Sequence, residues 1–319
     1  MKLQTPVQLK DPPERFRLNH RFFSMGSCFA EHLANNLIHH HLSLTVNPFG
    51  ITFNPLSLAS QLHRMLNHLP PRKDELFQHD GLYHHWEYHG RFSQANPETA
   101  LEGMRLAFDE GATRLRSAQQ LIITWGSAHY YRFLTDNRIV NNCHKVSNTA
   151  FERLRASQQQ IMDQWEPILN RILSENPQVQ VNLTVSPVRY LRDGLIENNR
   201  SKATLLLTAE QLTQTFPGQV YYFPAYELLI DELRDYRFYA EDMTHPTSQS
   251  VQYILEKWMQ TMLDPIDVPT WELLQNLIRQ LDHRPLHPDH PDQERIRQKV
   301  HLELDQLLAS LSIGTDSPR

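Results

Sequence analysis

Two short motifs, far apart in the chain, carry side chains that could perform nucleophilic chemistry. The first reads Gly-Ser-Cys over residues 26–28, and the second reads Asp-Met-Thr-His over residues 242–245. A serine or cysteine nucleophile needs a base that removes its proton, and that base needs an orienting partner. In this pattern Ser27 or Cys28 would attack, His245 would be the base and Asp242 would orient it. The pair of motifs indicates a hydrolase or an acyl-transfer enzyme.

The choice between the two candidate nucleophiles depends on their local setting. Residues 21–25 form a strand candidate and a helical pattern follows Cys28, so the motif lies on a strand–turn–helix. Cys28 is the stronger nucleophile at neutral pH, and the positive end of the helix dipole is expected to lower the pKa of its thiol. Ser27 would depend wholly on His245. The structural alternative is that Ser27 caps the helix and Cys28 is a small buried residue.

The elements that must position these motifs alternate along the chain. Apolar runs predict strands at residues 21–25, 42–46, 120–125, 179–185 and 218–223, and helical spacing predicts helices at residues 29–41, 55–68, 98–118, 151–175, 201–214, 247–263, 271–281 and 291–311. This alternation is typical of a parallel α/β sheet with helices on both faces. The candidate loops follow strand carboxyl ends, the edge at which open α/β sheets bind ligands.

Three regions are expected from the boundaries of this pattern. Residues 1–20 read as an N-terminal arm, residues 21–263 as the main α/β domain, and residues 264–319 as a helical C-terminal extension. The prolines between residues 283 and 291 predict a linker inside the extension. Its helices are candidates for self-association, which would make the protein a homo-oligomer.

Composition excludes several classes of function. The 319 residues carry a net charge of −5, so no basic surface points to nucleic acid or to an anionic membrane. No apolar run reaches the roughly 18 residues of a membrane span, and the first residues lack the apolar core of a signal peptide. With 2 cysteines, a disulfide framework is not expected and a cytoplasmic location is predicted.

Metal and cofactor sites are not expected either. The histidine run 39–41 does not place two rings on one helix face, and the four-residue step from His85 to His89 lacks the glutamate of a metalloprotease motif. Cys143 and His144 are adjacent, but no Cys-x-x-Cys is present. An acyl-transfer mechanism still needs donors for its oxyanion. The candidates are the backbone amide of Gly50 with Asn47 beside it, and Asn142 or His144.

The ordered motifs resemble the GSCFA family, whose name is the sequence of residues 26–30. The resemblance covers about residues 20–260 and includes the blocks at 47–51, 124–126, 142–145, 186–189, 201–203, 222–227, 231–239 and 242–246. The family is grouped with the SGNH hydrolases. The resemblance therefore implies a flavodoxin-like three-layer α/β/α fold with a mostly parallel sheet, and hydrolysis or transfer of an acyl group from a small molecule or a glycan.

The family pattern maps onto this chain with two departures. Where SGNH hydrolases carry Gly-Asp-Ser, this chain has Cys28 at the nucleophile position and Ser27 at the aspartate position. The asparagine of the third SGNH block is missing near residues 126–129, and Asn142 or His144 would have to replace it. The Asp-x-x-His block matches at Asp242 and His245. The lost asparagine leaves a second interpretation, a ligand-binding protein that keeps the fold without catalysis.

Overall fold

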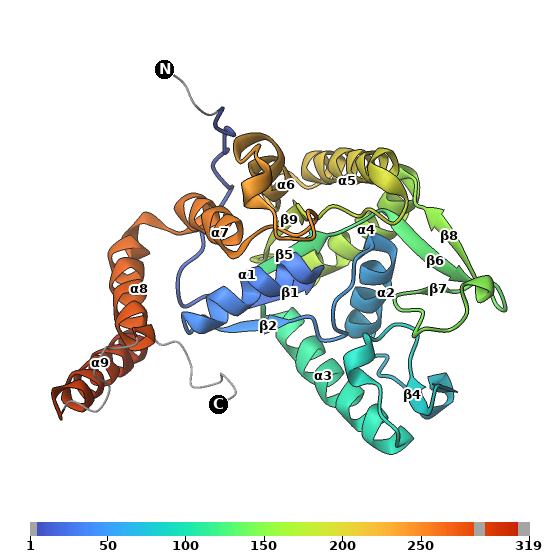
Figure 1. The fold of residues 1–319 in the computed structure, drawn as a ribbon, viewed down its shortest axis with the longest axis horizontal. Coiled ribbons are helices and arrows are strands. Elements are labelled where there is room, and N and C mark those ends of the chain that lie inside the picture. The colour runs from blue at the N-terminus through green and yellow to red at the C-terminus, as the bar shows by residue number, and fades with distance from the viewer. Residues whose placement is uncertain (1–4, 284–290, 312–319) are drawn as a thin grey trace.

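The computed structural model describes residues 5–283 and 291–311, built around a five-stranded parallel sheet (Figure 1). The strand order is β10-β9-β5-β1-β2, and every neighbouring pair is parallel. The strands are β1 (Phe22–Gly26), β2 (Leu44–Val46), β5 (Gln120–Trp125), β9 (Gln180–Val185) and β10 (Val220–Tyr222). The predicted parallel α/β sheet is confirmed, and the carboxyl ends of its strands meet at one edge.

Burial on both faces explains why the central strands are apolar runs instead of alternating ones. All six residues of β5 and all six of β9 are buried. Successive side chains point to opposite faces. Ile123 and Trp125 therefore enter one hydrophobic cluster, and Ile122 enters another. Such strands occur where helices cover both faces of a sheet.

Each hydrophobic cluster is completed by its own helices. The cluster containing Trp125 takes residues from α2 (Pro55–Leu66), α3 (Pro97–Ser117), α4 (Gln158–Glu175) and α5 (Gly194–Thr215). The cluster containing Ile122 takes residues from α1 (Cys28–His39), α6 (Ala225–Glu227), the π-helical turn Leu228–Glu232 and α7 (Ser248–Met262). Helices thus pack on both faces of the sheet, as the alternation of elements predicted.

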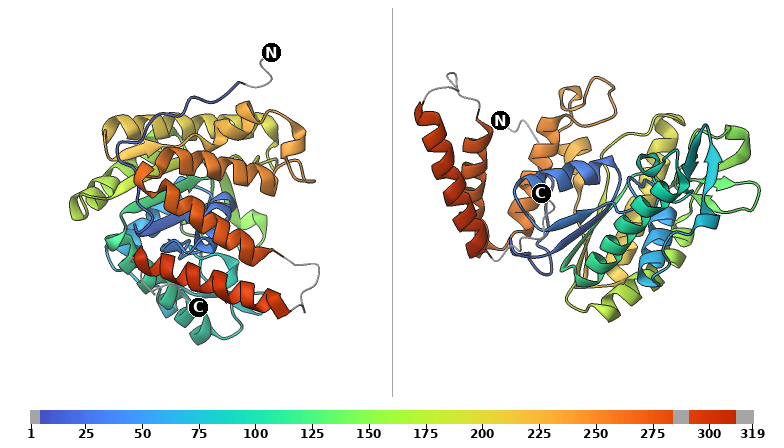
Figure 2. Two further views of the ribbon diagram at one scale, coloured as in Figure 1. Left: turned by 90° about the vertical axis from the view of Figure 1, so that its left-hand side faces the viewer. Right: turned by 90° about the horizontal axis from the view of Figure 1, so that it is seen from below.

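The last two helices lie side by side at one end of the molecule (Figure 2). They are α8 (Val268–Asp282) and α9 (Pro291–Ser310). Trp271 of α8 packs against the ring of His40 at 4.7 Å and belongs to the same cluster as α1. The predicted proline linker falls largely on residues 284–290, outside the described residues. No helix in the described parts of the chain is long and apolar enough to cross a bilayer.

A second layer of strands was not predicted from the sequence. It contains the hairpin β3 (Phe77–His79) and β4 (Leu82–His84) and an antiparallel sheet of β6 (His129–Phe133), β7 (Ile139–Val140) and β8 (Phe151–Arg155). The helix predicted over residues 151–175 is wrong at its start. Phe151 and Leu154 are spaced like one helical face, but Phe151 pairs with Phe133 in the sheet. The helix begins after Ser157, whose hydroxyl accepts the Gln160 amide.

Candidate functional site

The turn that carries the candidate nucleophiles requires a glycine. Gly26 ends β1 at φ +149°, and a Cβ there would lie 2.2 Å from the Thr124 carbonyl oxygen. The next amide, that of Ser27, donates to the same carbonyl at 3.2 Å, and the Gly26 carbonyl accepts the Thr52 amide at 2.9 Å. Because β1 and β5 approach so closely, the chain leaves the sheet sharply and enters α1 at Cys28.

The two candidate nucleophiles face different surroundings. Ser27 is fully buried, and its hydroxyl has no hydrogen-bond partner among the described residues. It occupies the N-cap position of α1 without forming a side-chain cap. Cys28 is partly buried and packs against the cluster that contains Phe29 and Val188. Of the two groups, the thiol is therefore the one with access to solvent.

Burial, and not the helix dipole, decides the pKa of Cys28. Desolvation raises the pKa of the thiol above its usual value, and Glu31 adds to the rise. The amides of Phe29 and Cys28 at the helix start lower the pKa, as does the nearby Lys202, but their combined effect is smaller. The expected contribution of the helix start is present, whereas the expected net lowering is wrong. Cys28 in this state is a neutral thiol at pH 7.

A buried lysine lies beneath the candidate site. Lys202 is 1% exposed, and its ammonium donates to the carbonyls of Gly126 and Ser186, at 2.6 Å in each case. These carbonyls follow β5 and β9, so hydrogen bonds from one lysine connect the carboxyl ends of the two central strands. Burial, followed by repulsion from Arg189, lowers the pKa of Lys202 to about 7. Within the described residues its charge has no carboxylate partner; Arg189 and Cys28 interact with it electrostatically.

The sequence contains a pattern from which the burial of this lysine could have been predicted. The buried residues of α5 recur at three- and four-residue steps and include Asn198, Ser201, Leu205 and Leu212. Lys202 falls on that buried face, next to Ser201. A lysine on the apolar face of a helix is rarely buried without a function or a partner.

The Asp-x-x-His motif adopts the expected hydrogen-bonded arrangement. The carboxylate of Asp242 contacts His245 Nδ1 at 2.6 Å, and its other oxygen accepts the amides of Thr244 and His245 at 2.9 Å each. These three bonds, led by the amides, hold the pKa of Asp242 well below its usual range. Both side chains are about half exposed. The arrangement fixes the imidazole and leaves Nε2 free to exchange a proton.

The two motifs are brought to the same edge of the sheet. The carbonyl of Thr244 accepts the amide of Arg189, which follows β9, at 3.1 Å. Arg189 and Cys28 both interact electrostatically with Lys202. No hydrogen bond joins Cys28 to the His245 ring among the described residues. This backbone hydrogen bond and these electrostatic interactions link the segment of the Asp–His pair to Cys28 through Arg189 and Lys202.

The four predicted oxyanion residues have different contacts. Asn47 accepts the Gly26 amide at 2.8 Å, and its side-chain nitrogen is buried with no partner among the described residues. The Gly50 amide donates to the Asn47 carbonyl at 2.7 Å, so this bond would have to break before Gly50 could bind an oxyanion. Asn142 accepts the amide of His144 at 2.9 Å. Asn47 therefore offers a buried side-chain donor that is unused among the described residues.

His144 serves the second layer of strands. Its Nε2 contacts the His85 carbonyl at 2.9 Å, and its ring lies against His84 and Trp86. Burial lowers the pKa of His144 to about 4, so the ring is neutral at pH 7. The role of His144 as an oxyanion donor stays a prediction. Its observed contacts stabilise the second layer of strands.

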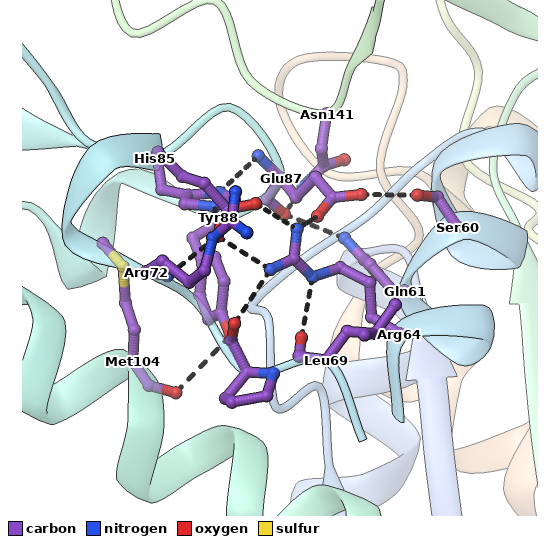
Figure 3. A network of polar contacts seen from close by, with 12 residues as sticks. Ser60, Gln61, Arg64, Leu69, Arg72, His85, Glu87, Tyr88, Met104 and Asn141 are labelled. Carbon is purple, nitrogen blue, oxygen red and sulfur yellow. Dashed lines mark hydrogen bonds and ion pairs between the residues drawn. The ribbon is translucent and has the colours of Figure 1, made fainter. Parts of the chain in front are cut away.

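A separate polar network lies beside a cavity of about 550 Å³ (Figure 3). Arg64 at its centre contacts Glu75 at 2.9 Å and Glu87 at 3.0 Å, and it donates to the Leu69 carbonyl at 3.1 Å. Ser60 donates to the same Glu87 carboxylate. The charges here are paired within the protein, which indicates a structural role. No cluster of three metal-ligating side chains occurs in the described parts of the chain.

Comparisons with known proteins identify a family and distantly similar solved structures. The model of the GSCFA family matches residues 21–258. No curated protein sequence matches the chain. A carbohydrate esterase family 3 protein from Talaromyces cellulolyticus is similar in structure with a TM-score of 0.36 and 9% sequence identity, over 81% of this chain and 99% of that one.

Proposed function

We propose that this chain, which belongs to the GSCFA family, is a hydrolase or acyltransferase that acts on an acyl ester or an acylated glycan. The observation that carries the proposal is the hydrogen-bonded pair of Asp242 and His245, in a segment bonded to Arg189 after β9, at the sheet edge where Cys28 follows β1. The strand order and the helices on both faces support placing the fold with the flavodoxin-like three-layer SGNH hydrolases.

The proposed reaction uses Cys28 as nucleophile. His245 Nε2 takes the thiol proton, and the sulfur attacks the ester carbonyl carbon to form a tetrahedral oxyanion. The free side-chain amide of Asn47 would stabilise this oxyanion. The carbon–oxygen bond then breaks, and the alcohol leaves with the proton from His245. Water or an acceptor hydroxyl attacks the thioester next, which returns the proton to Cys28 and releases the acyl product.

The mechanism requires Cys28 and His245 to approach each other during turnover. The loop that carries His245 is attached by the bonds of Thr244 to Arg189 and of His245 to Ala240, and its two functional side chains are about half exposed. A loop held this way at the surface has room to close over a bound substrate. Ser27 remains the alternative nucleophile, although its hydroxyl is fully buried.

One observation favours the second candidate function, ligand binding without catalysis. The pKa of the Cys28 thiol is raised by burial, and no bond to His245 activates it in this state. A protein that kept the fold for binding would need neither a thiolate nor a nearby base. The two functions differ in whether acyl transfer occurs at Cys28.

A mutational assay distinguishes these functions. Purified protein is tested against short acyl esters, and the Cys28→Ala and Ser27→Ala variants are compared with Cys143→Ala. Cys143 is the matched control because it is the other free cysteine and packs in the second layer of strands. Loss of the nucleophile should lower kcat/KM by about 10³-fold or more. A confirmed activity that survives both the Cys28 and the Ser27 change refutes the assignment.

Two further expectations stay proposals. Both cysteines are free, which supports a reducing compartment such as the cytoplasm. The paired helices α8 and α9 leave apolar side chains such as Leu273 and Leu302 exposed, which supports self-association through the C-terminal extension.

A further inference from the structure

A cavity of about 350 Å³ adjoins the loop of the Asp–His pair. We name it the Arg189 cavity. Its wall is formed by the segment after β9, the π-helical turn and the segment before the Asp–His pair, with side chains that include Leu191, Leu195, Tyr236 and Met243. Met243 belongs to the Asp-x-x-His motif itself. The cavity therefore borders the loop that carries His245.

The wall of the Arg189 cavity is unusually apolar for an exposed surface. Leu191 is 45% exposed, Leu195 53%, Met243 51% and Tyr236 77%. Exposed apolar side chains that gather around one hollow mark a binding surface, whereas scattered ones do not. This surface fits an aliphatic or aromatic group.

Of the charged side chains that line the cavity, Arg189 has no carboxylate partner among the described residues. Arg234 is paired with Asp231 at 2.9 Å, and Asp235 is paired with the Arg237 guanidinium at 3.9 Å. Among the described residues, the Arg189 side chain hydrogen-bonds only to the neutral Asn199, at 3.3 Å, and to the hydroxyl of Tyr239. Its Nε is buried and has no hydrogen-bond partner among the described residues. A guanidinium left in this state is a ready donor for an oxyanion.

A second cation strengthens the positive field behind Arg189. The buried ammonium of Lys202 is close enough for Arg189 to affect it electrostatically, and no described carboxylate pairs with either group. The neutral thiol of Cys28 does not supply the missing negative charge, because burial raises its pKa. Arg189, and Lys202 when it is protonated, have no counter-ion among the described residues and therefore favour a ligand that brings one.

We propose, building on the acyl-ester chemistry above, that the substrate is an anionic amphipath whose oxyanion binds Arg189 and whose apolar part lies on Leu191, Leu195 and Tyr236. A carboxylate and a phosphate share the chemistry that Arg189 recognises, namely two oxygens that accept a pair of parallel N–H bonds. The remainder of the molecule then extends toward Met243 and the Asp–His pair.

Equilibrium binding tests this proposal without turnover. Octanoate, octyl phosphate and the neutral octanamide are titrated into the full chain and into its Cys28→Ala variant by calorimetry. Both anions should bind about 10-fold or more tightly than octanamide. Tighter binding of only one anion identifies the oxyanion, a carboxylate or a phosphate. Equal affinity for the three ligands overturns the proposal.

Variants of the two arginines locate the preference. Arg189→Met should reduce the preference for the anions to about 2-fold or less and leave the affinity for octanamide unchanged. Arg234→Met is the matched control, because that arginine lines the same cavity but is paired with Asp231. A preference that survives Arg189→Met, with folding checked by thermal denaturation, contradicts the assignment. Should that variant not fold, the wild-type ligand series still decides.

This outcome is separable from that of the proposed function. Anion-selective binding without any ester cleavage supports the cavity and refutes catalysis. Ester cleavage that depends on Cys28, without anion selectivity, supports catalysis and refutes the cavity assignment.

Discussion

Replacement of Lys202 by methionine should change how the stability of the protein depends on pH. Methionine has nearly the same length, so it fills the space between the strand ends without carrying a charge. It leaves the carbonyls of Gly126 and Ser186 without their donor. That loss costs about 1–3 kcal/mol per carbonyl at every pH. The pH-dependent part of the effect comes from the ammonium alone.

The magnitude follows from the pKa of the buried lysine. In the folded chain the pKa of Lys202 is about 7, against 10.5 for the ordinary side chain. Between these values the unfolded chain binds one more proton than the folded chain, so raising the pH favours folding. From pH 7 to pH 10 the gain is about 4 kcal/mol, at about 1.36 kcal/mol per pH unit. Below pH 7 both states are protonated and this contribution stays constant.

Chemical denaturation at several pH values measures the difference. The free energy of unfolding of the wild type minus that of Lys202→Met should rise by about 4 kcal/mol between pH 7 and pH 10. The exposed Lys73 provides the control, and Lys73→Met should show no comparable rise. A difference that changes by less than about 1 kcal/mol would mean that the folded protein does not disfavour the charged lysine.

Three further changes test other parts of the structure. Asp242→Asn should lower kcat/KM on a confirmed ester by about 10²- to 10⁴-fold and leave the fold intact, because the carboxylate orients an exposed imidazole. Gly26→Ala should cost about 3 kcal/mol or more in denaturation experiments, since its Cβ would lie 2.2 Å from the Thr124 carbonyl oxygen. Arg64→Met should cost about 3–5 kcal/mol, because it removes the arginine that pairs with two partly buried glutamates, Glu75 and Glu87. The exposed Arg72→Met should cost about 0–1 kcal/mol. Wild-type kcat/KM in Asp242→Asn, or a wild-type denaturation midpoint in Gly26→Ala, would contradict these expectations. Equal losses of unfolding free energy in Arg64→Met and Arg72→Met would do so as well.

The parts of the fold that the sequence predicted are those with a strong local signal. The apolar runs at 120–125 and 179–185 are buried strands because both faces of the sheet are covered. The second layer gave no such signal, since its strands are two to five residues long and rich in polar side chains. Pairing with distant strands decides their structure, and a single sequence does not display that pairing.

The candidate site was predictable to a different extent at each residue. The hydrogen bond that His245 Nδ1 donates to the Asp242 carboxylate follows from their three-residue spacing, and it is present. The pKa direction of Cys28 was not predictable, because it depends on how deeply tertiary packing buries the thiol. Arg189 was part of a recognised motif, but only the structure shows that its charge lacks a carboxylate partner. Long-range contacts, which no local pattern contains, determine these properties.

Trapping of an acyl-enzyme tests the central claim most directly. The full chain is incubated with an ester that it cleaves, quenched in acid, digested and analysed by mass spectrometry for acylated peptides. The account predicts an acyl group on Cys28, none on Cys143, and slower removal of that group in the Asp242→Asn variant. Confirmed turnover with no acyl group on Cys28 or Ser27 would contradict it.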